Sequence, residues 1–132
     1  MPDGRALGTA PHNIDGEKGF LGGLFVNNRV FKDVAPFLRP EHFAYAPHGL
    51  IFDAATRIIQ AGNIADPITL KRYCETNETL ADIGGPAYLA DLAASVVTPI
   101  NAAEYGWIIY DLYRRRAVIP TQPIVRLDLV GS

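Results

Sequence analysis

The pattern of apolar and polar positions is clearest from Asn101 to Ile119, a stretch that we read as one helix of about five turns. Its apolar residues recur at steps of three or four and form one face, made of Tyr105, Ile108, Ile109, Leu112, Tyr113 and Ile119. Roughly opposite lies a second apolar stripe, made of Trp107, Tyr110, Ala117 and Val118. A surface helix normally has one apolar face. The helix is therefore either central to a single domain, or it packs on its own core with one face and on a partner with the other.

Shorter segments with helical spacing precede this helix, and Pro, Gly and Asn residues separate them. We expect helices between Asn13 and Asn27, from Val30 to Leu38, from His48 to Ala61, from Asp66 to about Thr76 and from Pro86 to about Val96, with a turn from Glu41 to Phe43 and a loop from Thr79 to Gly85. No stretch before residue 120 alternates with a period of two. The predicted fold class is all-α, a small bundle of about six helices that ends in the long helix.

The expected core consists of apolar residues on the inner faces of these helices, namely Phe20, Leu24, Ile51, Ile58, Leu89 and Leu92, and we also expect Ile68, Leu70 and Tyr73 to face inward. The first helix contains four glycines, and each weakens a helix by up to about 1 kcal/mol relative to alanine. Close approach of a neighbouring helix backbone would explain them.

We predict three parts along the chain. Residues 1–11 are rich in Gly, Ala and Pro and should form a flexible arm. Residues 12–119 form the helical domain. Residues 120–132 form a divergent tail, where Pro120 and Pro123 stop the helix and the segment Ile124–Val130 is weakly strand-like without a partner strand.

Composition and charge change this picture little. The chain has 132 residues, 48% of them hydrophobic, and a net charge of −2, which fits one domain with a core and gives no global basic field for nucleic acid. The one dense basic run is Arg114 to Arg116. In a helix, successive side chains point about 100° apart around the axis, so these three arginines form no single patch. It is a solvated helix end, a contact for a protein partner or a contact for nucleic acid. Without a membrane span or signal peptide, a soluble cytoplasmic protein is expected.

The residues that could carry chemistry do not form a recognisable site. His12, His42 and His48 lack metal-ligand spacing, so a cap or surface role is expected for them. Cys74 is alone and reads as a small buried hydrophobe. The glycines around Gly22 are not followed by the Lys and Ser or Thr of a phosphate loop. We therefore expect no enzyme, no cofactor and no metal.

Several segments taken together resemble a known family, the N-terminal domain of bacterial DnaB-type replicative DNA helicases. The resemblance covers about Pro11 to Ile119, and its most specific piece is Gly84–Leu92, GGPAYLADL. The other pieces, in the same order as in the family, are Pro11–Ile14 with Glu17 and Leu21–Leu24, Leu38–Phe43, His48 with Ile51 and Phe52, Asp66–Leu70, and Thr98 with Asn101, Ala102, Tyr105 and Ile109.

The resemblance implies a small helical head followed by a helical hairpin, with the helix Asn101–Ile119 as the first arm. In that family the domains pair through the hairpin, assemble into a ring above the motor domains and take part in docking primase. This sequence departs from the family in three ways: it has no motor domain with a Walker loop, the tail stands where the second arm should follow, and Gly16 and Gly19 replace better helix formers.

From the resemblance we expect a non-catalytic oligomerisation and protein-docking domain of a replicative helicase. Its expected partners are a second copy in a dimer, the ring and motor domain of the full-length family, and primase, without strong nucleic-acid or membrane binding. The expected interface residues are Trp107, Tyr110, Tyr113, Arg114 and Val118. One alternative is a stand-alone or truncated regulator that binds the N-terminal domain of a full-length helicase. Another is a small DNA-binding helical module, which would need basic residues clustered on one helix face.

Overall fold

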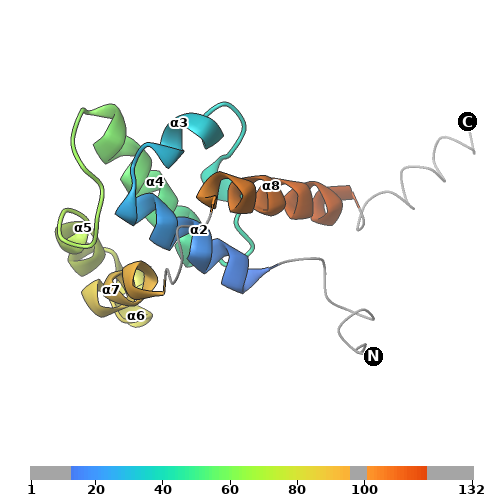
Figure 1. Cartoon of the computed structure of the whole chain (residues 1–132). Helices are drawn as coiled ribbons and strands as arrows, with labels where there is room; N and C mark the ends of the chain where they lie inside the picture. The colour runs from blue at the N-terminus through green and yellow to red at the C-terminus, as the bar shows by residue number, and fades with distance from the viewer. Residues whose placement is uncertain (1–12, 96–100, 119–132) are drawn as a thin grey trace, which may run out of the picture.

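The structure of the chain, a computed structural model, describes residues 13–95 and 101–118 (Figure 1). These residues contain only helices and turns, which confirms the all-α prediction. The elements are α2 (Ile14–Val26), α3 (Val30–Val34), the 3-10 helix η1 (Pro40–His42), α4 (Ala46–Gln60), α5 (Lys71–Thr76), α6 (Glu78–Asp82), α7 (Pro86–Ala94) and α8 (Ala102–Val118). The arm 1–11 and the tail 120–132 lie outside the described residues.

Local capping sets where the helices start. The Asn13 side chain accepts a hydrogen bond from the backbone N–H of Gly16 at 2.8 Å, as predicted for the start of α2. Pro47 lies in the first turn of α4, where its missing N–H costs no intrahelical bond. Asn101 accepts from the N–H of Ala103 at 3.2 Å, just before α8. These three residues mark helix starts through local interactions alone.

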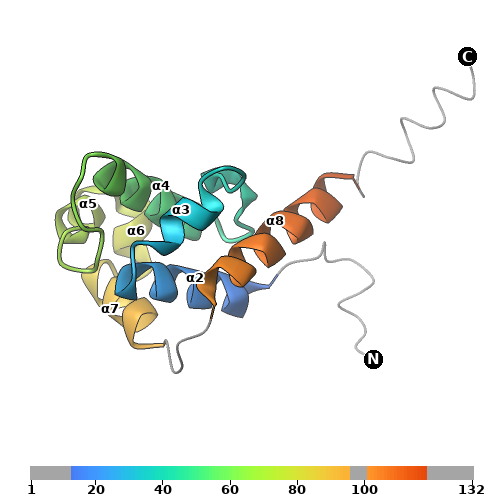
Figure 2. The ribbon, with the colours of Figure 1, turned by 45° about the horizontal axis from the view of Figure 1, so that its top comes forward.

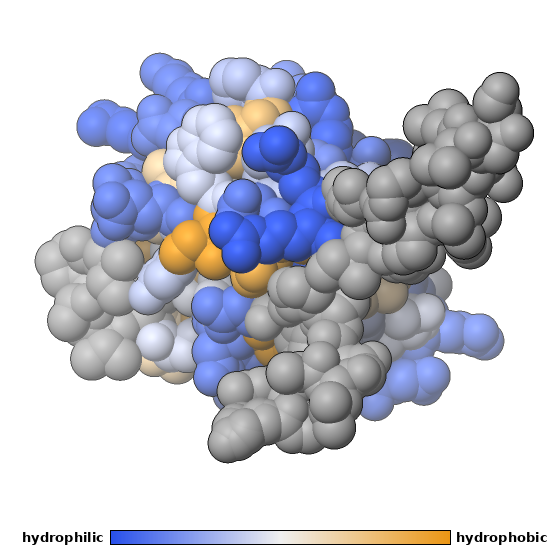
Figure 3. All heavy atoms as spheres, turned by 90° about the vertical axis from the view of Figure 1, so that its right-hand side faces the viewer, coloured by the Kyte–Doolittle hydropathy of each residue, from blue (hydrophilic) through white to orange (hydrophobic). Residues whose placement is uncertain are grey.

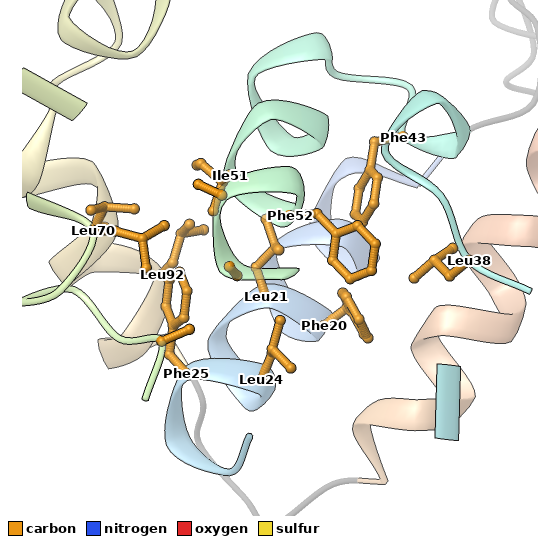
Figure 4. Close-up of a cluster of buried hydrophobic side chains, with 14 of the residues drawn as sticks. Phe20, Leu21, Leu24, Phe25, Leu38, Phe43, Ile51, Phe52, Leu70 and Leu92 are labelled. Carbon is orange, nitrogen blue, oxygen red and sulfur yellow. The ribbon is translucent and has the colours of Figure 1, made fainter. Parts of the chain in front are cut away.

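The core lies between α2, α4 and α7, with α3, η1 and α8 along one side (Figures 1 and 4). Three phenylalanines occupy its centre, and the Phe52 ring lies 5.7 Å from Phe20 and 5.4 Å from Phe43 between ring centroids. Five of the six predicted core residues are fully buried, and only Ile58 is half-buried at the edge. Burying side chains of this size stabilises the fold by about 1.5–3 kcal/mol each.

Some of the predicted details were wrong. Ile68 is 81% exposed, because the Asp66 carboxylate accepts the N–H groups of Ile68 and Thr69 at 2.9 Å and holds a tight turn that buries Leu70 instead. The predicted helix from Asp66 therefore begins only at Lys71. The predicted loop from Thr79 to Gly85 contains α6, which starts where Asn77 accepts from the N–H of Leu80.

Glycines let α8 approach the head closely. A Cβ atom added to Gly23 would lie 2.7 Å from the Cβ of Ala102, and one added to Gly106 would lie 2.7 Å from a methyl of Val34. Gly19 likewise faces the ring of Tyr105. Gly19 and Gly23 thus mark the place where α2 and α8 pack together, in agreement with the close approach that the sequence indicated.

Gly23→Ala is expected to lower the free energy of unfolding by about 1 kcal/mol. Overpacking against Ala102 costs about 2 kcal/mol, which exceeds the gain of up to about 1 kcal/mol in helix propensity. In an Ala102→Gly background the same change should stabilise the protein, because the blocking methyl group is gone. Urea denaturation of both pairs of variants measures the sign. Equal effects in the two backgrounds would contradict the contact.

Candidate protein-interaction surface

The long helix α8 packs on the head near its start, and its C-terminal half projects away from it (Figures 1 and 2). Its inner side is covered, with Ala102 4% and Ile109 2% exposed and Gly106 buried. On its outer side Trp107 is 54% and Ile108 40% exposed. The helix therefore has one apolar side in the core and further apolar side chains in solvent.

Aromatic side chains join the projecting half of α8 to the segment between α3 and η1. The Trp107 ring stacks on Phe37 with centroids 3.9 Å apart, and Tyr110 lies 5.5 Å from the same Phe37. The His42 ring lies 5.1 Å from Tyr110 and 4.4 Å from Tyr113. We call these five residues, Phe37, His42, Trp107, Tyr110 and Tyr113, the aromatic cluster. It covers one side of Trp107 and leaves the rest exposed.

The three arginines at the end of α8 have different partners. Arg114 lies over the Tyr110 ring at 5.8 Å from its centroid, and Arg115 pairs with Asp111 at 3.1 Å. Arg116 lies over the Tyr113 ring at 6.0 Å and donates a hydrogen bond to the backbone oxygen of His42 at 2.8 Å. Because they diverge, they do not form one basic patch. Strongly hydrophilic side chains lie beside hydrophobic ones on the face that Figure 3 shows.

The structure brings most of the predicted interface residues together. Trp107 and Arg114 are exposed, whereas Tyr110 and Tyr113 are half-buried in the aromatic cluster. Val118 is in the last turn of α8, and its side chain lies outside the described residues. Ile108, which we placed on the inner face, is at its solvent edge, because it is one residue, or about 100°, away from the buried Ile109.

Phe37 and His42 belong to the cluster but were not among the predicted interface residues, and Phe37 is the one to which the sequence analysis assigned no role. It follows Pro36, after α3 has ended at Val34, so helical spacing gives no indication of its direction. Its backbone N–H still bonds the Val34 oxygen at 3.0 Å, and this turn directs the ring toward α8.

A buried polar network connects α2, α4 and α7. Glu17 is 2% exposed, and one carboxylate oxygen lies 2.7 Å from His48 Nδ1. The carboxylate also accepts the backbone N–H groups of Ala44 at 2.6 Å and Tyr45 at 3.3 Å. The Tyr88 hydroxyl lies 2.6 Å from His48 Nε2. The expected cap or surface role of His48 was therefore wrong, because its side chain is fully buried.

The Glu17 carboxylate selects one tautomer for a neutral His48 ring. A carboxylate only accepts hydrogen bonds, so His48 Nδ1 donates to Glu17. In the neutral ring, Nε2 then accepts from the Tyr88 hydroxyl. Burial, followed by the negative charges of Tyr45, Glu17 and Asp91, raises the pKa of Tyr88 to about 12. The network thus keeps Tyr88 protonated and joins three helices through one chain of hydrogen bonds.

Stability should fall in alkaline solution through Tyr88. The pKa of Tyr88 is raised from 10.0 to about 12. Its contribution to the free energy of unfolding is therefore complete below pH 10 and is lost as the pH rises through 12. Tyr88→Phe should remove this component of the pH dependence and lower stability at neutral pH. Urea denaturation at a series of pH values from 8 to 12 measures it, and identical profiles for the two proteins would contradict the assignment.

The remaining candidate residues fit structural roles. His42 Nδ1 accepts the backbone N–H of Arg39 at 2.9 Å, which is the predicted cap role. Cys74 is 1% exposed, and burial raises the pKa of its thiol. Within residues 13–95 and 101–118, no three His, Cys, Asp or Glu side chains gather as metal ligands would, and no helix has the length and apolar character of a membrane span.

Comparison with known proteins points to one family. Residues 9–111 match the profile of the DnaB-like helicase N terminal domain. Among similar curated proteins, the replicative DNA helicase DnaB of Rickettsia prowazekii is 41% identical over 109 residues, which are 83% of this chain and 22% of that protein. The DnaB of Geobacillus stearothermophilus is 31% identical over 118 residues, 89% of this chain and 26% of that protein. The chain thus spans about a quarter of the length of these relatives.

A solved structure supports the same likeness. The crystal structure of the N-terminal domain of DnaB helicase from Mycobacterium tuberculosis superposes with a TM-score of 0.80 at 28% identity. The match covers 90% of this chain and 86% of the other chain. The likeness therefore extends over nearly the whole helical arrangement.

Proposed function

The chain belongs to the DnaB-like helicase N-terminal domain family, and on that basis we propose that it is a non-catalytic oligomerisation and protein-docking domain of a replicative DNA helicase. In this proposal two copies pair through the outer side of α8, and pairs build the ring that carries the motor domains. The protein acts in DNA replication in the cytoplasm.

The observation that carries the pairing proposal is the exposed aromatic side of a projecting helix. Trp107 is more than half exposed although it is already stacked on Phe37, and Ile108 lies beside it. Large aromatic residues and arginines are enriched at protein interfaces. A rigid Trp107, held in one orientation by Phe37 and accompanied by Arg114, is suited to insert into a partner surface.

Cysteine cross-linking tests where the copies meet. Arg114→Cys places a thiol on the exposed side of α8, and the native Cys74 is buried and should not react. A short bismaleimide should join two copies of this variant at micromolar concentration. Ile68→Cys, which is also exposed but lies outside α8, is the matched control and should not be cross-linked to a second copy. Equal cross-linking of the two variants would contradict pairing through α8.

We also propose that the head contributes a docking surface for primase. Val26 at the end of α2 and Ile64 between α4 and α5 are exposed and line a shallow hollow of about 320 Å³. Asn28 holds this region rigid, because its side chain bonds the backbone of Leu24 and both backbone groups of Ala65. Rigid exposed apolar groups favour a docking role.

A pull-down with the primase of the same organism tests this proposal. Ile64→Ser should reduce the recovery of primase at least several-fold, without affecting the pairing of the chain. Lys71→Ser, on the surface of α5, provides the control. Unchanged recovery with the Ile64 variant would show that primase binds elsewhere or not at all.

A further inference from the structure

His42 connects the head to the projecting half of α8 through three different parts of one residue. Its ring contacts Tyr110 and Tyr113, and its backbone oxygen accepts the hydrogen bond from Arg116. Its Nδ1 accepts the backbone N–H of Arg39, the residue before η1, at 2.9 Å. The residue is 7% exposed. His42 therefore contacts both the N-terminal end of the short η1 helix and the C-terminal half of α8.

This arrangement requires a neutral imidazole. An Nδ1 atom that accepts a hydrogen bond carries no proton, so the proton of the neutral ring is on Nε2. A protonated ring would carry hydrogens on both nitrogens, and the hydrogen on Nδ1 would oppose the N–H of Arg39. The ring would have to rotate or leave its place, and the contacts with Tyr110 and Tyr113 would change with it.

The charged groups around the ring are Arg39 just before η1, Glu41 in η1 and Arg116 in α8. Burial lowers the pKa of His42 below 6.5; the nearby carboxylate of Glu41 opposes this effect, and Arg39 and Arg116 reinforce it. The side chains of Tyr110 and Tyr113 also face the ring. The stability that the neutral ring contributes is therefore present above pH 6.5 and is lost as the pH falls through the lowered value.

We propose that His42 is a proton-sensitive latch that holds the C-terminal half of α8 on the head and releases it when the imidazole is protonated. The latch presents Trp107, Tyr110 and Arg114 in one orientation at neutral pH and loosens them in mildly acidic solution. The latch itself is independent of pairing, whereas its effect on association rests on the proposed function.

Trp107 is the only tryptophan of the chain and reports on the latch directly. It stacks on Phe37, and its neighbour Tyr110 contacts His42. Lowering the pH from 7.5 to 5 at a concentration where the protein is monomeric should shift the Trp107 emission in a one-proton transition. The resonances of His42 should titrate with the same midpoint, below pH 6.5.

The decisive variant is His42→Gln. Glutamine at this position can accept the N–H of the residue that caps the turn, as in a capping box, but it does not titrate. The variant should fold, show native helicity and have a flat emission between pH 5 and 7.5, whereas His12→Gln should keep the wild-type transition. An unchanged transition in His42→Gln, or a His42 that titrates without any change in emission, would overturn the latch.

Measuring the association of the chain at two pH values distinguishes a failure of the latch from a failure of the proposed pairing. If the chain pairs, sedimentation at pH 5 and 7.5 should show weaker pairing at the lower pH for the wild type, and no such loss for His42→Gln. Equal losses in both proteins would also overturn the latch. A chain that is monomeric at both pH values but keeps the emission transition would refute pairing and leave the latch supported.

Discussion

Replacing Glu17 with alanine is expected to lower the free energy of unfolding by about 3–5 kcal/mol, because three buried donors lose their acceptor and each buried unsatisfied donor costs about 1–3 kcal/mol. The carboxylate is 2% exposed and accepts hydrogen bonds from His48 and from two backbone N–H groups. Without it, His48 and the N–H groups of Ala44 and Tyr45 remain buried without an acceptor. The junction between α2 and the start of α4 should therefore lose its structure first.

Glu17→Gln is the matched control, because its amide oxygen can still accept one of these hydrogen bonds at nearly unchanged volume. We expect its loss of stability to be clearly smaller than that of the alanine variant. Urea denaturation followed by circular dichroism measures both. A loss below about 1 kcal/mol for Glu17→Ala would be typical of a solvated surface carboxylate and would contradict the buried network.

The largest expected effect on association comes from Trp107→Ala. Removing an aromatic anchor from the centre of an interface costs about 2 kcal/mol or more, which weakens pairing roughly 30-fold. Trp107 also contributes to the fold through its contact with Phe37, but it is 54% exposed and lies outside the main core. The variant should therefore stay folded while it loses pairing.

Ile68→Ala serves as the matched control for this variant. It removes an even more exposed apolar side chain from the head, far from α8 in the sequence, and should leave pairing unchanged. Sedimentation of the three proteins at equal concentration measures the difference. If Trp107→Ala associates as the wild type does, the surface is wrongly assigned.

The helices of this chain follow largely from local signals in the sequence. Asn13, Pro47 and Asn101 mark helix starts that the structure confirms, and the glycines of α2 indicated a close helix contact. Ile68 could not be placed in this way, because a capped turn at Asp66 interrupts the helical period. Local propensity therefore predicts elements well but not the direction of side chains after a break.

The contacts over long distances in the sequence could not be predicted. Glu17 and His48 are in different helices, and nothing around either residue indicates that the two side chains meet in the core. Trp107 and Tyr110 were recognised as a second apolar stripe of α8, but their packing on Phe37 and His42 depends on the turn after α3. The sequence indicated that these side chains form a stripe apart from the core face of α8, and the fold shows which residues they pack on.

Sedimentation equilibrium of the unmodified chain tests the central claim most directly. Across concentrations on the order of 1–100 μM at pH 7.5 we expect a concentration-dependent dimer, because the exposed Trp107 supplies an aromatic anchor of the kind that contributes most of the binding energy at protein interfaces. A mass that stays at the monomer value through the whole series would contradict self-association through α8.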